Sequence, residues 1–398
     1  MPSFPVLVLN SGSSSIKFSV YEANGKERKR LLEGEAEGIG TDQGKFHIND
    51  ASGAKLVEQA QPLPTLAAAV ALVANALKGD KLPAPQAIGH RMVAGGPTVV
   101  ENQRITPELI DEMERYTAFA PLHTPIAVFI MRESLRLFPG VPNFVCLDTW
   151  FHHTLPAAAR ELPIPHEYSA MGVRRYGAHG ISYESIVYQL QPSVPEKLIV
   201  AHLGNGCSIS AIRNGVCIDT SMGLTPTGGL ISGTRTGDID PGVLLFILRK
   251  IAETTPKTSE AADKLEKAAA KQAGLLGVSG LSNDMRDLRS AITQGNAQAR
   301  LAVDQFVYTI RKWIGAYVAE LGGLDTLVFT GGIGVYSPET RGEVCTGLEA
   351  LGIVLDLERN QAHGPAIISA SNSPATVRVV PPAEDLMIVN HVLRLLAS

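Results

Sequence analysis

Two stretches of the chain share one pattern of apolar and polar positions. Residues 6–9 are valine and leucine, residues 10–15 are asparagine, serine and glycine, and polar and apolar residues then alternate. Residues 198–212 repeat this order of apolar run, small polar turn and alternation. Each stretch predicts two strands joined by a tight turn. One such hairpin in each half of the chain favours a duplicated α/β domain.

The turns of both hairpins consist of small residues. Glycine and serine leave backbone N–H groups accessible, and such turns bind the oxygen atoms of phosphate. A single hairpin of this kind is also typical of an ordinary surface turn. Because there are two such hairpins, we expect phosphate to lie between the two halves of the chain. Nucleotide lies in this position in the actin, sugar-kinase and Hsp70 folds, and the comparison is an analogy of fold.

Other segments have helical periodicity. Residues 63–77 are apolar enough for a buried helix but too few to cross a bilayer. From Ala299 to Leu321 apolar residues recur every three or four positions, which predicts an amphipathic helix ended by Gly322. The last predicted helix, at residues 386–396, is placed to fold back on the first domain.

Glycine-rich segments mark two further candidate sites. The predicted strand at residues 325–330 runs into Gly331-Gly-Ile-Gly334 and then a helix, whose N-terminus attracts anions. Residues 219–241 are rich in glycine, threonine and serine and lack apolar periodicity. Because such a segment is neither a core nor a flexible linker, we expect an ordered functional loop.

Charged and titratable residues stand at predicted strand ends and loops. Arg91 and Asp148 each follow an apolar strand, where open α/β sheets place their ligand contacts, and His179 lies among small residues before a helix. Arg91 is also typical of a solvated surface, and His179 of a packed turn. His152 and His153 suggest zinc, but no third ligand follows at a known spacing.

The amino-acid composition limits which classes of protein the chain can belong to. Hydrophobic residues make up 45% and charged residues 19%, as in globular chains, and the net charge of −4 gives no reason to expect nucleic acid or an anionic membrane as partner. The four cysteines lack Cys-x-x-Cys spacing and no signal peptide is visible, which favours the reducing cytoplasm. The sequence contains neither a P-loop nor a dinucleotide-binding glycine pattern.

Nine separated segments make the chain resemble the acetate kinase (acetokinase) family from end to end. They include Leu9-Asn-Ser-Gly-Ser-Ser-Ser-Ile-Lys-Phe, Arg175-Tyr-Gly-Ala-His-Gly and Phe329-Thr-Gly-Gly-Ile-Gly, and the others lie at 89–91, 120–123, 148–152, 202–206, 220–226 and 233–241. The resemblance implies a cytoplasmic homodimer with duplicated actin-like ATPase (ribonuclease H-like) domains and a nucleotide cleft between them. It also implies ATP + acetate ⇌ ADP + acetyl phosphate by direct in-line transfer with Mg²⁺, or Mn²⁺ in its place.

Domain boundaries follow from the same resemblance. We expect residues 1–149 together with 385–398 to form the first actin-like domain, closed by the C-terminal helix. Residues 150–384 are expected to form the second, which carries the nucleotide site and the dimer interface.

The family's reactive positions fall on matching residues of this chain. The resemblance implies Asp148 as the catalytic acidic residue, and His179 and Arg235 as groups that stabilise the transferring phosphoryl group. It implies Arg91 as the group that binds the substrate carboxylate. The residues implied to serve the metal are Asn10 and Glu384.

The remaining implied positions bind the two substrates. The methyl group of acetate would lie in a small apolar pocket formed by Val93, Leu122, Ala178 and Pro226. Lys17 would contact the phosphates of ATP. The other residues implied to hold the nucleotide are His202, Leu203, Gly204, Asn205, Gly206, Asp284, Met285, Arg286, Gly331, Gly332, Ile333, Gly334 and Val335.

The chain departs from the family pattern at three places. Ala94 stands where relatives often have histidine, and Val335-Tyr336 where they usually have glutamate and asparagine. The second departure concerns polar contacts to the nucleoside. Some relatives carry phenylalanine where this chain has Ala178, which predicts a roomier acyl pocket and propionate as a secondary substrate.

The expected reaction does not require a residue that acts as a general base. A carboxylic acid with a pKa of about 4 is already ionised at neutral pH, so the acceptor is a nucleophile without deprotonation. We therefore expect Asp148 to orient arginine or metal-bound water, with a covalent phospho-aspartate as a less favoured alternative. Two other classes stay open: a chaperone-like ATPase of the same fold, and a hydrolase of a phosphorylated nucleotide or polyphosphate.

Overall fold

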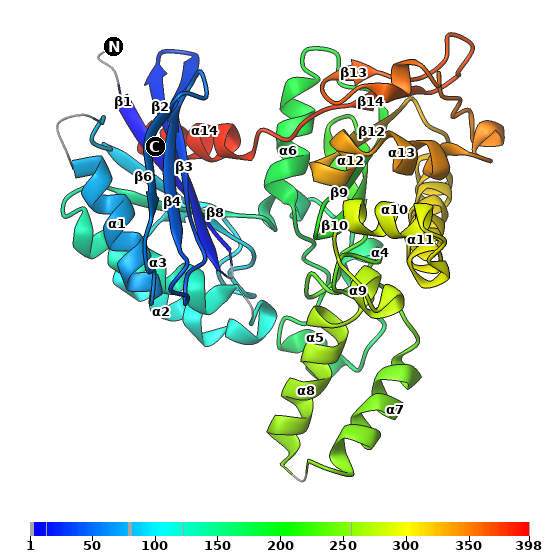
Figure 1. Cartoon of the computed structure of the whole chain (residues 1–398), viewed down its shortest axis with the longest axis horizontal. Coiled ribbons are helices and arrows are strands. Elements are labelled where there is room, and N and C mark those ends of the chain that lie inside the picture. Colours follow the sequence, from blue (N-terminus) through cyan, green and yellow to red (C-terminus); the bar gives the residue numbers. More distant parts are fainter. Residues whose placement is uncertain (1–3, 13, 79–81, 122, 256, 398) are drawn as a thin grey trace.

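The computed structural model describes residues 4–12, 14–78, 82–121, 123–255 and 257–397. Within these residues the strands form two sheets, one of eight strands and one of six. Figure 1 shows the sheets in two lobes side by side, with helices α7 and α8 projecting below the second. The two lobes agree with the predicted duplication.

The first sheet has the order β5-β4-β3-β2-β1-β6-β8-β7. The first predicted hairpin is β1 and β2, and parallel pairing of β1 with β6 and of β6 with β8 brings the ends of these strands to one edge. Its strands are β1 (Phe4–Ser11), β2 (Ser15–Asn24), β3 (Glu27–Glu37), β4 (Lys45–Asp50), β5 (Lys55–Ala60), β6 (Ala87–Met92), β7 (Gln103–Arg104) and β8 (Asn143–Leu147).

The second sheet has the order β11-β10-β9-β12-β14-β13. Here β9 and β10 form the second predicted hairpin, and β9, β12 and β14 run parallel. Its strands are β9 (Lys197–Leu203), β10 (Cys207–Arg213), β11 (Val216–Thr220), β12 (Thr326–Thr330), β13 (Ala366–Ile367) and β14 (Thr376–Val379).

Alternation along the central strands places a core on each face of both sheets. In β1, Leu7 and Leu9 pack in the core that includes α1 and α3, whereas Val6 and Val8 pack against α14. In β9, Ile199 and Ala201 face α11, whereas Leu198 and Val200 face α6. The central strands of each sheet are therefore covered by helices on both faces.

The helices follow the predicted pattern with shifted ends. The helix expected at 63–77 begins at Leu66, because Thr65 accepts the Ala68 N–H at 3.2 Å and so caps it. Helix α7 was not predicted from the sequence; Asp240 caps it and Pro241 begins it. The helices are α1 (Leu66–Lys78), α2 (Pro107–Arg115), α3 (Thr124–Leu137), α4 (Ala157–Arg160), α5 (His166–Ala170), α6 (Gly180–Gln189), α7 (Pro241–Ala252), α8 (Thr258–Lys271), α9 (Gly274–Ser279), α10 (Met285–Thr293), α11 (Ala297–Leu321), α12 (Gly331–Tyr336), α13 (Pro338–Cys345) and α14 (Glu384–Ala397).

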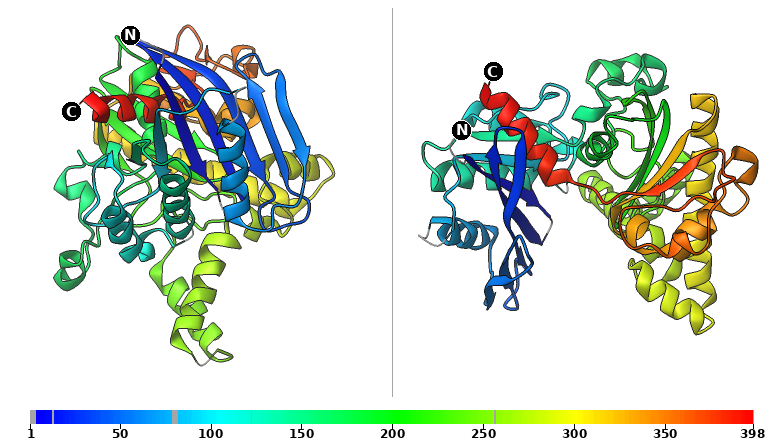
Figure 2. Two further views of the ribbon diagram at one scale, coloured as in Figure 1. Left: turned by 90° about the vertical axis from the view of Figure 1, so that its left-hand side faces the viewer. Right: turned by 90° about the horizontal axis from the view of Figure 1, so that it is seen from above.

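Helix α14 connects the end of the chain to its beginning. It follows β14 of the second sheet but packs on β1 and β6 of the first, where Ile388 and Val392 are fully buried. Figure 2 shows this helix, in red, crossing from the second lobe to the blue strands. The crossing places Glu384, the first residue of α14, between the two lobes. In the described part of the chain, no helix is long and apolar enough to span a membrane.

Candidate active site

A small cavity of about 190 Å³ lies where the strand ends of the two lobes face each other. The first lobe contributes the ends of β1 and β6 and the residue after β8. The second lobe contributes the loop before α6, the β9–β10 turn and the glycine-rich loop. The lining residues are Asn10, Ser11, Arg91, Val93, His123, Ala127, Asp148, Ala178, His179, Gly206, Pro226 and Arg235.

Arg91 lies between two carboxylates in this cavity. Its Nε and Nη2 donate to Asp148 at 2.9–3.1 Å, and its Nη1 donates to Glu384 at 2.8 Å. Only 2% of the Asp148 side chain is exposed, and burial raises the pKa of this carboxyl to about 6, against the opposing charge of Arg91. Each terminal nitrogen of Arg91 keeps one further N–H, so the guanidinium can still donate to a bound anion.

His179 is held by a chain of hydroxyl groups. Its Nδ1 lies 2.8 Å from the Ser208 hydroxyl, which in turn contacts the Tyr183 hydroxyl. Burial first, and then the charges of His202, Arg91 and Arg235, lower the pKa of His179 well below its usual range, so the ring is neutral. If Tyr183 donates to Ser208 and Ser208 donates to Nδ1, the proton of His179 resides on Nε2.

Arg235 comes from the glycine-rich loop and brings a positive charge without a counter-charge. Its Nη1 donates to the Pro226 carbonyl at 3.1 Å, and its Nη2 lies 3.4 Å from Nε2 of His123. No ion pair of Arg235 with a carboxylate occurs among the described residues. A Cβ atom on Gly206 would lie 3.3 Å from both Arg235 Nη1 and His179 Nε2, so these two donors converge on the β9–β10 turn.

The structure brings together three of the four residues predicted for the acyl pocket. Val93, Ala178 and Pro226 all line the cavity, and Ala127 lines it with them. Leu122, the fourth predicted member, lies outside the described residues. Because Ala178 has a single methyl group, little side-chain volume fills its side of the cavity.

A second cavity of about 680 Å³ adjoins the same turn in the second lobe. Gly331 opens α12 with φ of +74°, and a Cβ atom there would lie 2.6 Å from the Leu203 carbonyl oxygen. Only glycine therefore fits this turn, and the N-terminus of α12 lies beside the β9–β10 turn. The lining residues are Gly204, Asn205, Asn283, Asp284, Met285, Arg286, Arg289, Gly332, Ile333, Tyr336, Ser337 and Glu339.

Some predicted residues lie away from both cavity walls. Leu203 and Val335 are buried in the core beneath the turns, and the side chain of Lys17 is exposed on β2. His202 stacks on His179 with ring centroids 4.3 Å apart. The remaining glycines, Gly331 and Gly334, shape the turn without lining the cavity.

Sequence reasoning missed several lining residues. Ser11 and His123 lie inside segments that resembled the family but received no role. Tyr336 was noted only as a departure from the family pattern, and Ser337 comes next; both lie within three residues of the predicted glycine turn, so their positions could have been found from that turn. No motif or periodicity in the sequence pointed to Arg289 or Glu339. These missed residues line the cavities in the structure.

The residues predicted to serve a metal fit a divalent cation only in part: Asn10 lines the first cavity, whereas Glu384 is not one of its lining residues and pairs with Arg91. Asn10 and Glu384 present the amide and carboxylate oxygens that Mg²⁺ prefers, and Mg²⁺ keeps several waters of its own. Among the residues that the structure describes, no three histidine, cysteine, aspartate or glutamate side chains are grouped to hold a metal. His152 contacts the Ala178 carbonyl and Cys217, whereas His153 stacks on Trp150. The two imidazole rings therefore make contacts with different residues.

The sequence matches known proteins over nearly its full length. Residues 5–390 match the profile of the acetokinase family. The acetate kinase of Phocaeicola vulgatus is 40% identical over 404 residues, which cover 98% of this chain and 99% of that protein. The acetate kinase of Dictyoglomus thermophilum is also 40% identical, over 99% of both chains.

Solved structures give the same result for the fold. The crystal structure of Porphyromonas gingivalis acetate kinase superposes with a TM-score of 0.85 at 37% identity and covers 99% of this chain and 100% of that chain. A propionate kinase from Francisella tularensis gives a TM-score of 0.89 at 34% identity, with 98% and 100% covered. The predicted fold class, with duplicated actin-like ATPase domains, is thereby confirmed.

Proposed function

The chain belongs to the acetokinase family, whose members are kinases that transfer phosphate to a carboxylate, and we propose that it transfers the γ-phosphoryl group of ATP to acetate, reversibly. The observation that carries this proposal is the convergence of Arg91, Arg235 and neutral His179 on one small cavity with an apolar side. Phosphoryl transfer requires mainly positioning and positive charge around the transferred group. A short carboxylate fits the cavity with its charged end toward the arginines.

Each polar group has a distinct part in the proposed reaction. The free N–H groups of Arg91 bind the carboxylate of acetate, and Val93, Ala178 and Pro226 contact its methyl group. Arg235 binds the oxygens of the transferring phosphoryl group, because no carboxylate of the described residues neutralises it. His179 donates from Nε2 to the same oxygens without giving up its proton.

Direct in-line transfer is the proposed course of the reaction. Both carboxylate oxygens of Asp148 accept hydrogen bonds from Arg91. A carboxylate engaged in this way is a poor nucleophile, which argues against a phospho-aspartate. Asp148 instead fixes the plane of the Arg91 guanidinium against the substrate.

Nucleotide and metal complete the proposal. The second cavity would hold the nucleoside of ATP, and the β9–β10 turn its phosphates. Asn10 and Glu384 would hold Mg²⁺, or Mn²⁺, through water molecules, and the cation would neutralise charge on the phosphates. The residues that would shape the nucleotide cavity from below are Leu203, Gly334 and Val335.

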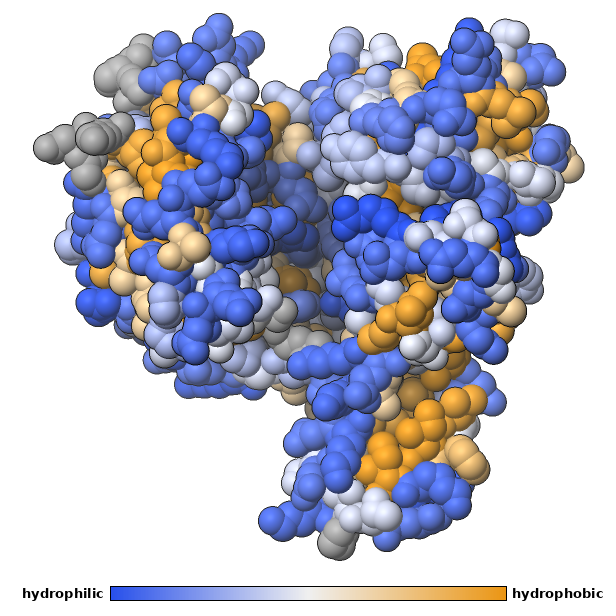
Figure 3. Space-filling model, in the orientation of Figure 1, coloured by the Kyte–Doolittle hydropathy of each residue, from blue (hydrophilic) through white to orange (hydrophobic). Residues whose placement is uncertain are grey.

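The proposed assembly is a cytoplasmic homodimer of two-domain chains, with residues 1–149 and 385–398 in one domain and 150–384 in the other. Helix α7 supports a dimer through the second domain, because Leu245 and Phe246 are 51% and 61% exposed. Figure 3 shows this apolar surface on the projecting helices. Sedimentation of wild-type protein and of Phe246→Asp tests it: a dimer that becomes monomeric is expected, and a monomeric wild type contradicts it.

The test of the reaction is an ATP-dependent hydroxamate assay with formate, acetate, propionate and butyrate. Acetyl phosphate is trapped by hydroxylamine, so acetyl hydroxamate is expected with acetate, less product with propionate, and little with butyrate. Phosphate release from ATP that does not depend on a carboxylate, with no hydroxamate, would instead indicate a hydrolase.

A further inference from the structure

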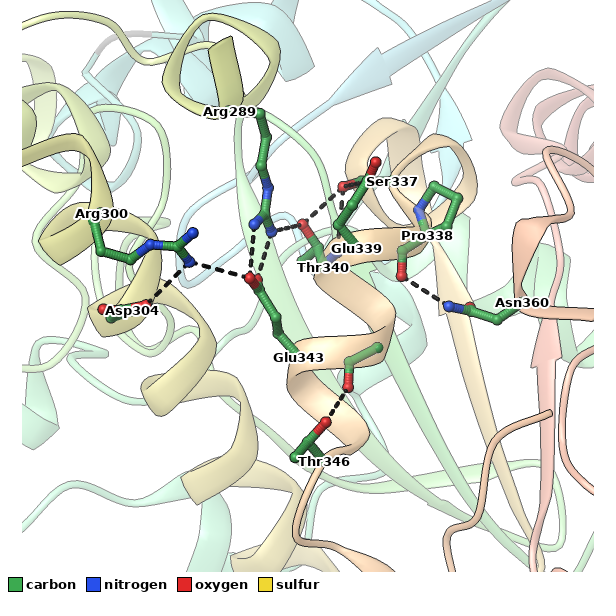
Figure 4. Close-up of polar contacts among 11 residues, drawn as sticks. Arg289, Arg300, Asp304, Ser337, Pro338, Glu339, Thr340, Glu343, Thr346 and Asn360 are labelled. Atoms are coloured by element: carbon green, nitrogen blue, oxygen red, sulfur yellow. Dashed lines mark hydrogen bonds and ion pairs between the residues drawn. The ribbon is translucent and has the colours of Figure 1, made fainter. Parts of the chain in front are cut away.

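An ion-pair network centred on Arg289, which itself lines the second cavity, connects two walls of that cavity. Arg289 lies on α10, one turn after Met285 and Arg286, and its guanidinium meets Glu343 of α13 in a two-point pair. The Nη1–Oε1 distance is 2.7 Å and the Nη2–Oε2 distance is 2.5 Å. Figure 4 shows Arg289 reaching across to α13. Parallel two-point pairs of this kind fix geometry as well as charge.

Hydroxyl groups extend this network to the cavity wall. Arg289 Nη2 donates to the Thr340 hydroxyl at 3.0 Å, and the Thr340 hydroxyl lies 2.8 Å from that of Ser337. Because Thr340 accepts from Arg289, its own proton is available to Ser337, which can donate to Glu339 at 3.3 Å. Ser337 directly follows Tyr336 and caps α13. The network therefore ends on three residues that line the cavity.

The network is partly shielded from solvent, with the Glu343 side chain 32% exposed. Thr340 is fully buried, and the Arg289 side chain is 20% exposed. Burial alone would raise the pKa of Glu343, but the hydrogen bonds and charges of Arg289 and then of Arg300 outweigh burial and lower that pKa, so the carboxylate is ionised at neutral pH. The Nε of Arg289 is buried and has no partner within the described part of the chain, so a ligand does not reach it in this arrangement.

We infer that Arg289 is a positioning residue for the nucleoside of the bound nucleotide. It sets the distance between the wall made by the start of α10 and the wall made by Tyr336, Ser337 and Glu339. The inference rests on the proposed function, which places the nucleoside in this cavity. Acetate binds in the other cavity, which shares no residue with the network, so the effect of losing Arg289 should be confined to the nucleotide.

The experiment compares Arg289→Ala with Arg300→Ala in the full-length protein. Arg300 contacts the same Glu343 from α11, at 3.3 Å, but is 44% exposed and does not line the cavity. Isothermal titration calorimetry with ADP should show a Kd raised roughly tenfold in Arg289→Ala, and KM for ATP should rise in parallel. KM for acetate and kcat should stay within about twofold of wild type, as should all values for Arg300→Ala.

Two further variants keep the test decisive. Glu343→Gln removes the partner charge from the other wall and should give the same selective rise in ADP Kd. Arg289→Lys keeps the charge but loses the two-point geometry, and should recover only part of the affinity; it also serves if Arg289→Ala does not fold. An unchanged ADP Kd in folded Arg289→Lys and Glu343→Gln, or an equal rise in KM for acetate, would overturn the inference.

Failure of the proposed function is distinguishable from failure of this inference. If the wild-type protein forms no acetyl hydroxamate, the reaction assigned above is wrong. The calorimetric titration with ADP does not depend on that reaction and still reports whether Arg289 supports the nucleotide cavity.

Discussion

The two lobes share one scaffold but place different chemistry at matching positions. In both, a central strand pairs antiparallel with its hairpin partner and parallel with a later strand, which pairs in turn with a third parallel strand. The orders are β2-β1-β6-β8 in the first lobe and β10-β9-β12-β14 in the second. The parallel strands of the first lobe end at buried charges, Arg91 and Asp148. Those of the second end at Thr330, which precedes the glycine turn, and at Val379.

The difference reflects two ways of binding an anion. Side-chain charges can be directed at a small carboxylate, but a buried charge must be paired, and Arg91 is paired with both Asp148 and Glu384. A glycine turn at a helix N-terminus offers backbone N–H groups to phosphate and leaves space for a large ligand. The parallel strands of the first lobe thus end at charged side chains, whereas those of the second lobe lead to a glycine turn beside a larger cavity.

The largest expected effect comes from removing the arginines of the first cavity. Arg91→Ala and Arg235→Ala should each lower kcat by about 10³-fold or more, because arginine contacts dominate the stabilisation of transferring phosphoryl groups. Arg91→Ala should also lose about 3–5 kcal/mol of stability, since it leaves buried Asp148 unpaired. Arg235 has no such partner in the described chain, so its variant should keep wild-type stability in urea. Near-normal turnover in both folded variants would remove the proposed site.

The next effect concerns the carboxylate contributed by α14. Glu384→Ala should raise the Mg²⁺ concentration for half-maximal activity by about 10–100-fold, as expected for a residue that supports a hydrated metal. KM for acetate should change much less. Titrations of Mg²⁺ and acetate on the same variant measure both quantities. Equal changes in the two, or no change, would contradict the metal assignment.

A smaller effect is expected in the second lobe, where we propose that a glycine turn, and not a charged side chain, shapes the nucleotide cavity. Gly331→Ala adds a Cβ atom at φ of +74° against the Leu203 carbonyl, a strain of about 1–3 kcal/mol. The variant should bind ADP more weakly and unfold at lower urea, while KM for acetate is retained. Gly364→Ala is the matched control, because nothing lies within 4 Å of its added Cβ. If both variants behave like wild type, the turn does not need glycine.

The smallest effect concerns the size of the acyl pocket. Ala178→Phe should lower kcat/KM for propionate more than for acetate, because the ring would occupy the space for the extra methylene. One methylene is worth about 1–3 kcal/mol in an apolar pocket, so the ratio should change by about 10-fold. Hydroxamate assays with both acids measure the ratio. An unchanged ratio would mean that Ala178 does not face the acyl group.

Patterns among neighbouring residues were enough to predict much of the fold and part of the candidate site from the sequence alone. Apolar periodicity and a terminal glycine located α11 to within two residues, at Ala297–Leu321 with Gly322 as its cap. The two hairpins and the turn at Gly331 were also recognised. Glycine and short polar residues favour turns over the interiors of helices and strands, so runs of them mark the turns. Arg91 and Asp148 could be proposed because each ends an apolar strand.

Only the tertiary structure decided how these residues combine. The pairing of Arg91 with Glu384 joins positions 293 apart in sequence and exists because α14 crosses back to the first sheet. Arg289 and Glu343 lie 54 residues apart on two helices with no shared pattern. Such contacts depend on strand order, helix packing and burial. These are set by the whole chain, whereas periodicity and turn chemistry are set by a few neighbouring residues.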